Sequence, residues 1–81
     1  MRILVADDSD IVRRGIIDIL SEEAEWNVCG EATNGSEALQ KALELEPDLV
    51  LLDVSMSVPF DRALFVEMLS ASCHYLHSRR P

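Results

Sequence analysis

The chain has 81 residues, a net charge of −8 and a hydrophobic content of 48%. The charge argues against direct binding to nucleic acid, and the hydrophobic content is too high for a disordered chain. No apolar run approaches the roughly 18 to 20 residues of a membrane span, and no signal-peptide pattern is present, so we expect a small cytoplasmic domain with no membrane partner. The two cysteines, Cys29 and Cys73, are expected to be reduced thiols.

The first 53 residues alternate strand and helix patterns. Short apolar runs at residues 2–6 and 48–53 predict strands buried on both faces, and residues 26–32 predict a less apolar strand nearer the sheet edge. Strands that alternate with helices over short loops indicate right-handed crossovers. We therefore expect an α/β domain with a parallel sheet.

Two amphipathic helices separate these strands. The first is capped by Asp8 or Ser9, and the second follows the turn signal Asn34-Gly35 and runs from about residue 36 to residue 46. Periodicity predicts a buried stripe on the first helix and charged residues on its wet side: Val12, Ile16, Ile19 and Leu20 against Arg13, Arg14, Asp18 and Glu22. On the second helix the predicted buried residues are Ala38, Leu39, Ala42 and Leu43.

Three acidic residues stand where two of the apolar strands end. Asp7 and Asp8 follow the first strand, and Asp53 closes the third. Carboxylates gathered at the carboxyl ends of parallel strands predict a pocket for a divalent cation, because such ions prefer hard oxygen ligands. Crowded carboxylates also repel one another, and a bound cation neutralises that repulsion. One of the three is a candidate phosphoryl acceptor.

The pattern changes after residue 53. Residues 1–53 carry 13 acidic and 4 basic side chains, whereas residues 54–81 carry 2 acidic and 3 basic ones. One helix is predicted at about residues 61–71. The last ten residues have no periodicity, and the trio Cys73, His74 and His77 lacks a fourth metal ligand, so an irregular solvated tail is expected.

Three segments, residues 3–8, 28–39 and 47–56, together resemble the receiver domain of bacterial response regulators. The middle segment is most similar to regulators that carry a helix-turn-helix output domain. The resemblance implies a flavodoxin-like (CheY-like) fold with strand order 2-1-3-4-5. Residues 1–56 are then a truncated receiver, with a three-stranded parallel sheet in the order 2-1-3, and residues 57–81 are a divergent tail without an output domain.

The resemblance also implies a role for each acidic residue. Asp53 matches the phosphoacceptor, Asp8 and Asp53 match the direct ligands of Mg²⁺, and Asp7 matches the residue that holds the metal through water. Ser55 matches the position whose backbone carbonyl completes the ligand set. The implied partner is a sensor histidine kinase, and the implied function is a receiver in a two-component phosphorelay rather than an enzyme.

The resemblance ends at Ser57. In the family a Ser or Thr that contacts the phosphoryl group ends a fourth strand and a Lys ends a fifth, and neither strand is expected here. The only lysine, Lys41, is expected to face solvent. We therefore predict weak Mg²⁺ binding and impaired phosphorylation and switching.

Without a fourth strand, the third strand becomes a sheet edge on which Val50, Leu51 and Leu52 are poorly covered. An apolar edge without protective charge invites pairing, which predicts a homodimer through this strand. Alternatively, the tail folds back over its own edge. Two other functions stay open: a self-associating, non-catalytic interaction module, and a phosphatase of the haloacid-dehalogenase type, which is disfavoured because Ser55 stands where that class has a second Asp.

Overall fold

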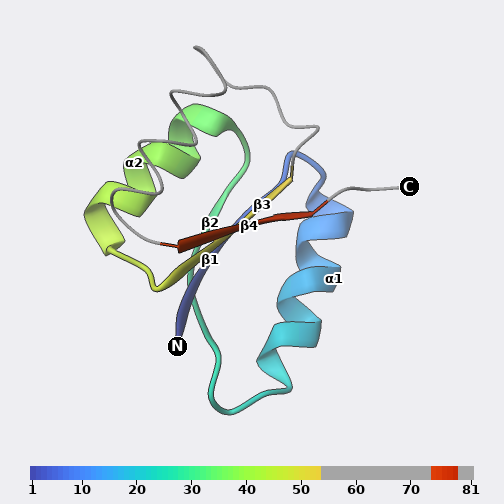
Figure 1. The fold of residues 1–81 in the computed structure, drawn as a ribbon. Coiled ribbons are helices and arrows are strands. Elements are labelled where there is room, and N and C mark those ends of the chain that lie inside the picture. The colour runs from blue at the N-terminus through green and yellow to red at the C-terminus, as the bar shows by residue number, and fades with distance from the viewer. Residues whose placement is uncertain (54–73, 79–81) are drawn as a thin grey trace.

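The computed structural model describes residues 1–53 and the backbone of residues 74–78. Its elements in chain order are β1 (Arg2–Ala6), α1 (Asp10–Ser21), β2 (Asn27–Ala32), α2 (Gly35–Leu45), β3 (Leu49–Asp53) and β4 (His74–Ser78). All neighbouring strands pair in parallel, in the order β2-β1-β3-β4. Helices α1 and α2 lie on opposite faces of this sheet (Figure 1). The predicted α/β class and the strand order 2-1-3 are confirmed.

Strand β4 corrects the expectation for the tail. It pairs with β3 along its whole length, from His74 opposite Leu49 to Ser78 opposite Asp53, and is the red arrow in Figure 1. The prediction that the third strand forms the open edge of the sheet is therefore wrong. The alternative, that the tail folds back over its own edge, is confirmed by this pairing. The predicted helix at residues 61–71 lies outside the described residues.

The three residues assigned to a dimer edge accordingly have other surroundings. Val50 and Leu52 are buried and Leu51 is half-buried. Val50 and Leu52 belong to a core between the sheet and α2, whose other members are Leu4, Ala6, Ala32, Ala38 and Ala42. The loss of the open β3 edge removes the reason for a homodimer through this strand.

Helix α2 forms where the sequence predicts it, with one difference in its buried face. Asn34 caps it by accepting a hydrogen bond from the Glu37 backbone N–H at 2.8 Å. Glu46 ends it in the left-handed conformation, with φ at 47°, directly before Pro47, which cannot continue a helix. Leu43, predicted to be buried, is 56% exposed. The alanines let the helix lie close to the sheet, and Leu43 then lies beyond the contact.

Helix α1 is capped by Ser9, whose side chain accepts a hydrogen bond from the Val12 backbone N–H at 3.3 Å. Its covered face agrees with the predicted one at Val12, Ile16 and Leu20, which are half-buried, and differs at two positions. Arg13, expected on the wet side, is 8% exposed, whereas Ile19, expected to be buried, is 65% exposed. Among the described residues, neither helix is long and apolar enough to cross a membrane.

Candidate functional site

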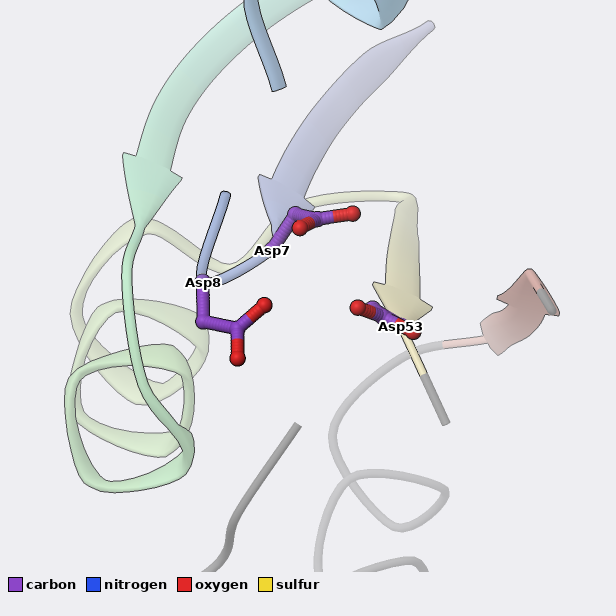
Figure 2. Close-up of side chains that lie close together, drawn as sticks. All are labelled: Asp7, Asp8 and Asp53. Atoms are coloured by element: carbon purple, nitrogen blue, oxygen red, sulfur yellow. The ribbon is translucent and has the colours of Figure 1, made fainter. Parts of the chain in front are cut away.

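Three carboxylates converge at the carboxyl edge of the sheet (Figure 2). One ligand oxygen from each of Asp7, Asp8 and Asp53 lies within 4.8 Å of the others. Asp7 and Asp53 are each 1% exposed, whereas Asp8 is exposed. Two buried acids and one exposed acid thus form an acidic cluster at this edge of the sheet, which we call the acidic pocket.

The pairing of β1 with β3 brings these residues together. In that parallel register Ala6 lies opposite Leu52. The next residue of each strand, Asp7 and Asp53, therefore emerges at the same edge of the sheet. Each follows a run of buried apolar residues, which anchors its backbone.

The loop that carries Asp7 and Asp8 is fixed by hydrogen bonds. The Asp7 backbone N–H donates to the carbonyl of Ala32 at 3.0 Å. The Asp7 Oδ1 atom accepts from the Ser9 backbone N–H at 2.8 Å, which closes a tight turn before α1 begins. Asp7 is consequently held at both its main chain and its side chain, and the strand passes into the helix with Asp8 at the bend.

Arg13 adds a buried positive charge behind this loop. Its guanidinium donates to the Asp7 backbone carbonyl at 2.9 Å, to Glu31 Oε1 at 2.9 Å and to Asp10 Oδ1. The hydrogen bonds that Arg13 donates to Asp10 and Glu31 raise the pKa of Arg13 above its ordinary value. These contacts therefore favour the charged form of the guanidinium.

Sequence periodicity alone did not reveal the role of Arg13. The predicted stripe was Val12, Ile16, Ile19 and Leu20, but the set Arg13, Ile16, Ile17 and Leu20 also has a helical spacing. Arg13 is buried and the other three members of the second set are half-buried, so the prediction was right for Ile16 and Leu20 and wrong for Ile19, which is exposed. The burial of Arg13 could have been inferred from its position: it is a basic residue four residues after the helix cap, at helical spacing with apolar residues.

Two further residues named from the sequence lie elsewhere. Lys41 is half-buried rather than in solvent: its Nζ donates to the backbone carbonyl of Glu31 and lies 3.8 Å from Glu37 Oε1. It therefore joins α2 to β2 instead of facing the acidic pocket. Ser55 lies outside the described residues.

The donor set of the pocket fits a divalent cation such as Mg²⁺. Carboxylate oxygens are hard ligands, and Mg²⁺ is commonly held by one or two carboxylates while it keeps several waters. Burial of Asp7 and Asp53 limits the screening of their charges by solvent, so a cation between them would be attracted strongly. Asp8 is the member of the cluster that is exposed to solvent.

A family model of the response regulator receiver domain matches residues 3–69. The chain belongs to this family. This match extends to residue 69, whereas the resemblance was expected to end at residue 56. Receiver domains of this family belong to response regulators of two-component systems, which confirms the coarse functional prediction.

Comparison with known receiver proteins shows what share of their length this chain covers. The transcriptional regulatory protein LnrK of Bacillus subtilis (strain 168) is 48% identical over 58 residues, which cover 72% of this chain and 26% of LnrK. The response regulator domain of Thermotoga maritima CheB superimposes with a TM-score of 0.86 at 28% identity, covering 98% of this chain and 60% of that domain. The chain thus spans about a quarter of this curated relative.

A third similarity concerns a complex. A chain from the crystal structure of the P1 domain of CheA3 with CheY6 from R. sphaeroides superimposes with a TM-score of 0.80 at 26% identity. The match covers 96% of this chain and 60% of that one. Because these alignments span nearly the whole chain, they include the region of β4 as well as residues 1–53.

Proposed function

We propose that this receiver domain accepts a phosphoryl group on Asp53 in a phosphorelay. The observation that carries the proposal is the cluster of Asp7, Asp8 and Asp53 at the carboxyl edge of the sheet. Asp53 ends β3, and its side chain is buried and lies near those of Asp7 and Asp8 (Figure 2). Its carboxylate is thus held in position as a nucleophile, at a buried place where solvent screens charges only weakly.

The proposed reaction forms a bond between an Asp53 carboxylate oxygen and phosphorus. The bond between phosphorus and a ring nitrogen of the donor phosphohistidine breaks, and its electron pair returns to the imidazole. The product is an acyl phosphate that stays on the chain, so the domain acts as an acceptor and not as an enzyme that turns over.

The acidic residues divide the binding of Mg²⁺ between them in this proposal. Asp8 and Asp53 hold the ion directly, Asp7 holds it through water, and the backbone carbonyl of Ser55 completes the set. Bound Mg²⁺ supplies the positive charge that screens the carboxylates from the incoming phosphoryl oxygens. The Asp7 backbone N–H donates to the Ala32 carbonyl, and the Asp7 side chain accepts a hydrogen bond from the Ser9 backbone N–H. These two hydrogen bonds fix Asp7 and so orient its water-mediated contact with the ion.

The described part of the chain now supplies one of the two residue types that the family resemblance requires beside Asp53. Strand β4 is present and ends at Ser78, the register partner of Asp53. A serine at the end of a fourth strand is the residue type and the position that the family resemblance requires. The lysine is different, because Lys41 is engaged with the Glu31 carbonyl. We therefore propose slow phosphorylation and weak Mg²⁺ binding.

The proposed donor is a sensor histidine kinase. Receiver domains interact with histidine kinases or phosphotransfer domains, and one similar chain comes from a complex between the P1 domain of CheA3 and CheY6. A cytoplasmic location and a regulator with a helix-turn-helix output domain are part of the same proposal, supported by the sequence of residues 28–39 and by the similarity to LnrK.

Labelling with a small phosphoryl donor tests the proposal. The chain is incubated with acetyl phosphate and Mg²⁺, and the acyl phosphate is followed by intact mass. Slow labelling that disappears in Asp53→Asn and without Mg²⁺ is the expected result. Asp18→Asn is the matched control, because Asp18 is exposed on α1 and the substitution removes the same charge. Labelling that persists in Asp53→Asn would exclude Asp53, and continuous phosphate release would indicate a hydrolase instead.

A further inference from the structure

An apolar groove lies at the amino edge of the sheet, at the opposite end of the strands from the acidic pocket. Figure 1 shows the N-terminus and the end of α1 at this same end of the molecule. The groove has a volume of about 210 Å³. The described residues that line it are all hydrophobic and come from β1, β3, the end of α1 and the chain before β2: Met1, Ile3, Leu20, Trp26, Leu49 and Leu51.

The two faces of the sheet are covered unequally beside this groove. Successive residues of a strand face opposite sides of the sheet. On β3, Val50 and Leu52 pack against α2 and are 0% and 2% exposed, whereas Leu49 and Leu51 on the α1 side are only half-buried. Trp26 is 40% exposed at the mouth of the groove. A hollow lined by large apolar side chains that stay partly exposed marks a place where another apolar surface binds.

The size and the lining of the groove select the kind of occupant. Pockets for small ligands usually have volumes of roughly 300 to 1,000 Å³ and a few polar groups that orient the ligand. This groove is smaller and its described lining is hydrophobic, so it suits a few apolar side chains of a larger partner. An amphipathic helix presents such side chains at the spacing i, i+3 or i+4, and i+7.

The rim of the groove is acidic. Glu22, Glu23 and Glu25 are all exposed in the turn that joins the end of α1 to Trp26, and we call these three the acidic rim. The turn is held beside the groove, because the Trp26 backbone N–H donates to the Glu23 carbonyl at 3.1 Å and the Met1 ammonium donates to the Glu25 carbonyl. Three carboxylates outnumber that one ammonium, so the rim is negative.

The charge of the rim decides between two possible occupants. A second copy of this chain would bring the same acidic rim and a net charge of −8, and like charges brought together disfavour association. A basic partner would instead be attracted. Apolar side chains that enter the groove would supply most of its affinity, and its positive charges would supply orientation and a faster encounter.

We propose that this groove binds an amphipathic helix of a partner protein, with the apolar face of that helix in the groove and its Lys and Arg side chains beside the acidic rim. The proposal does not rest on phosphorylation or on Mg²⁺, because the groove and the acidic pocket lie at opposite edges of the sheet. It assigns a second recognition surface to the chain.

Trp26 provides the measurement, because it is the only tryptophan of the chain and lies at the mouth of the groove. The probe is a synthetic helical peptide of Leu and Lys, with Leu at the spacing i, i+3, i+4 and i+7, titrated into the full chain. Saturable binding that moves the Trp26 emission to shorter wavelength is the expected result. A companion peptide with Glu in place of every Lys should bind at least roughly 10-fold more weakly.

Two pairs of variants test the charge and the apolar contact. Glu25→Lys reverses a charge of the rim, and Glu44→Lys makes the same change at an exposed position of α2, on the other face of the sheet. We expect the first to raise the Kd for the Leu-Lys peptide roughly fivefold or more and the second to leave it within about twofold. Leu20→Ser should raise the Kd roughly 10-fold, whereas Leu43→Ser, on the exposed side of α2, should not.

Circular dichroism of each variant shows whether it is folded, and Leu51→Ala replaces Leu20→Ser if that variant is not. Equal effects of Glu25→Lys and Glu44→Lys would show attraction to the whole acidic chain and overturn the proposal. No change of the Trp26 emission at saturating peptide would overturn it too. A shift of that emission with protein concentration alone would assign the groove to a second copy, and a shift with neutral phosphatidylcholine vesicles would assign it to a lipid surface.

Discussion

Replacing Asp53 by Asn is expected to stabilise the metal-free chain and to remove its response to Mg²⁺. Asp7 and Asp53 are each 1% exposed, and their ligand oxygens lie within 4.8 Å of each other. Like charges held this close repel, and burial excludes the water that would screen them. Asn has nearly the shape of Asp without its charge, so the repulsion between the two buried side chains disappears.

The structure gives the size of this effect. At an effective dielectric constant of about 20, two unit charges at the 4.8 Å upper limit of this separation repel by about 3.5 kcal/mol. The amide also turns one acceptor oxygen into a donor, and a lost hydrogen bond to a charged group costs about 1.5 to 3 kcal/mol. The remainder is a gain of about 1 kcal/mol in the free energy of unfolding, or about 4 to 8 °C in Tm for a small domain.

Asp53→Asn should also reduce the stabilisation that Mg²⁺ gives to the folded chain. At a Mg²⁺ concentration about ten times the Kd, binding to the folded state stabilises the wild-type chain by about 1.4 kcal/mol. Asp53→Asn lacks one of the two direct ligands and should gain little. The variant is thus more stable than wild type without metal, and the difference narrows or reverses when metal is added.

Urea unfolding with and without Mg²⁺ measures both effects. The control is Asp18→Asn, which removes one negative charge from the exposed side of α1. We expect the control to unfold like wild type under both conditions, within about 0.5 kcal/mol. An Asp53→Asn chain that is less stable than wild type without metal, or that still gains the full stabilisation from Mg²⁺, would refute the reasoning.

Two further predictions concern packing and pH. Gly30→Ala places a methyl group 2.8 Å from Leu45 Cδ1 and should cost about 1 kcal/mol in urea unfolding, whereas Gly15→Ala meets nothing within 4 Å in α1 and should gain about 1 kcal/mol. Equal effects of the two would contradict the packing of α2 on β2. Because the pKa of Arg13 is raised by folding, the stability that this arginine contributes is complete below the pKa of an unfolded arginine. It is lost only as the pH rises through the still higher pKa of the folded chain. The stability difference between wild type and Arg13→Met should therefore be the same at pH 7 and pH 9; a difference that falls at pH 9 would show that another group titrates there.

The sequence was sufficient to predict the acidic pocket. The short apolar runs that predict buried strands end at Asp7, Asp8 and Asp53. Parallel strands bring their carboxyl ends to the same edge of the sheet. Two local rules, strand burial and strand direction, therefore determine where the three carboxylates meet. The helix caps at Ser9 and Asn34 were also predictable, because a capping side chain acts within a few residues of its own position.

The fourth strand could not be predicted from residues 74–78 themselves. The run His-Tyr-Leu-His-Ser is short and has little apolar character, and its strand conformation comes from the hydrogen-bonding edge that β3 offers. Arg13 was misjudged for a related reason: a charged residue is assigned to the wet side by its type, whereas three acceptors around it make burial favourable. Both features depend on partners that are distant in the sequence.

A two-step NMR titration tests the central claim most directly. Mg²⁺ is added first and beryllofluoride, a phosphoryl mimic, second, while the amide signals of the wild-type chain and of Asp53→Asn are followed. We expect Mg²⁺ to shift the signals of residues 7–9 and Asp53. We expect beryllofluoride to shift them further only in the presence of Mg²⁺ and only in the wild type. Signals that stay unchanged at residues 7–9 and Asp53 through both additions would contradict a phosphoacceptor site at Asp53.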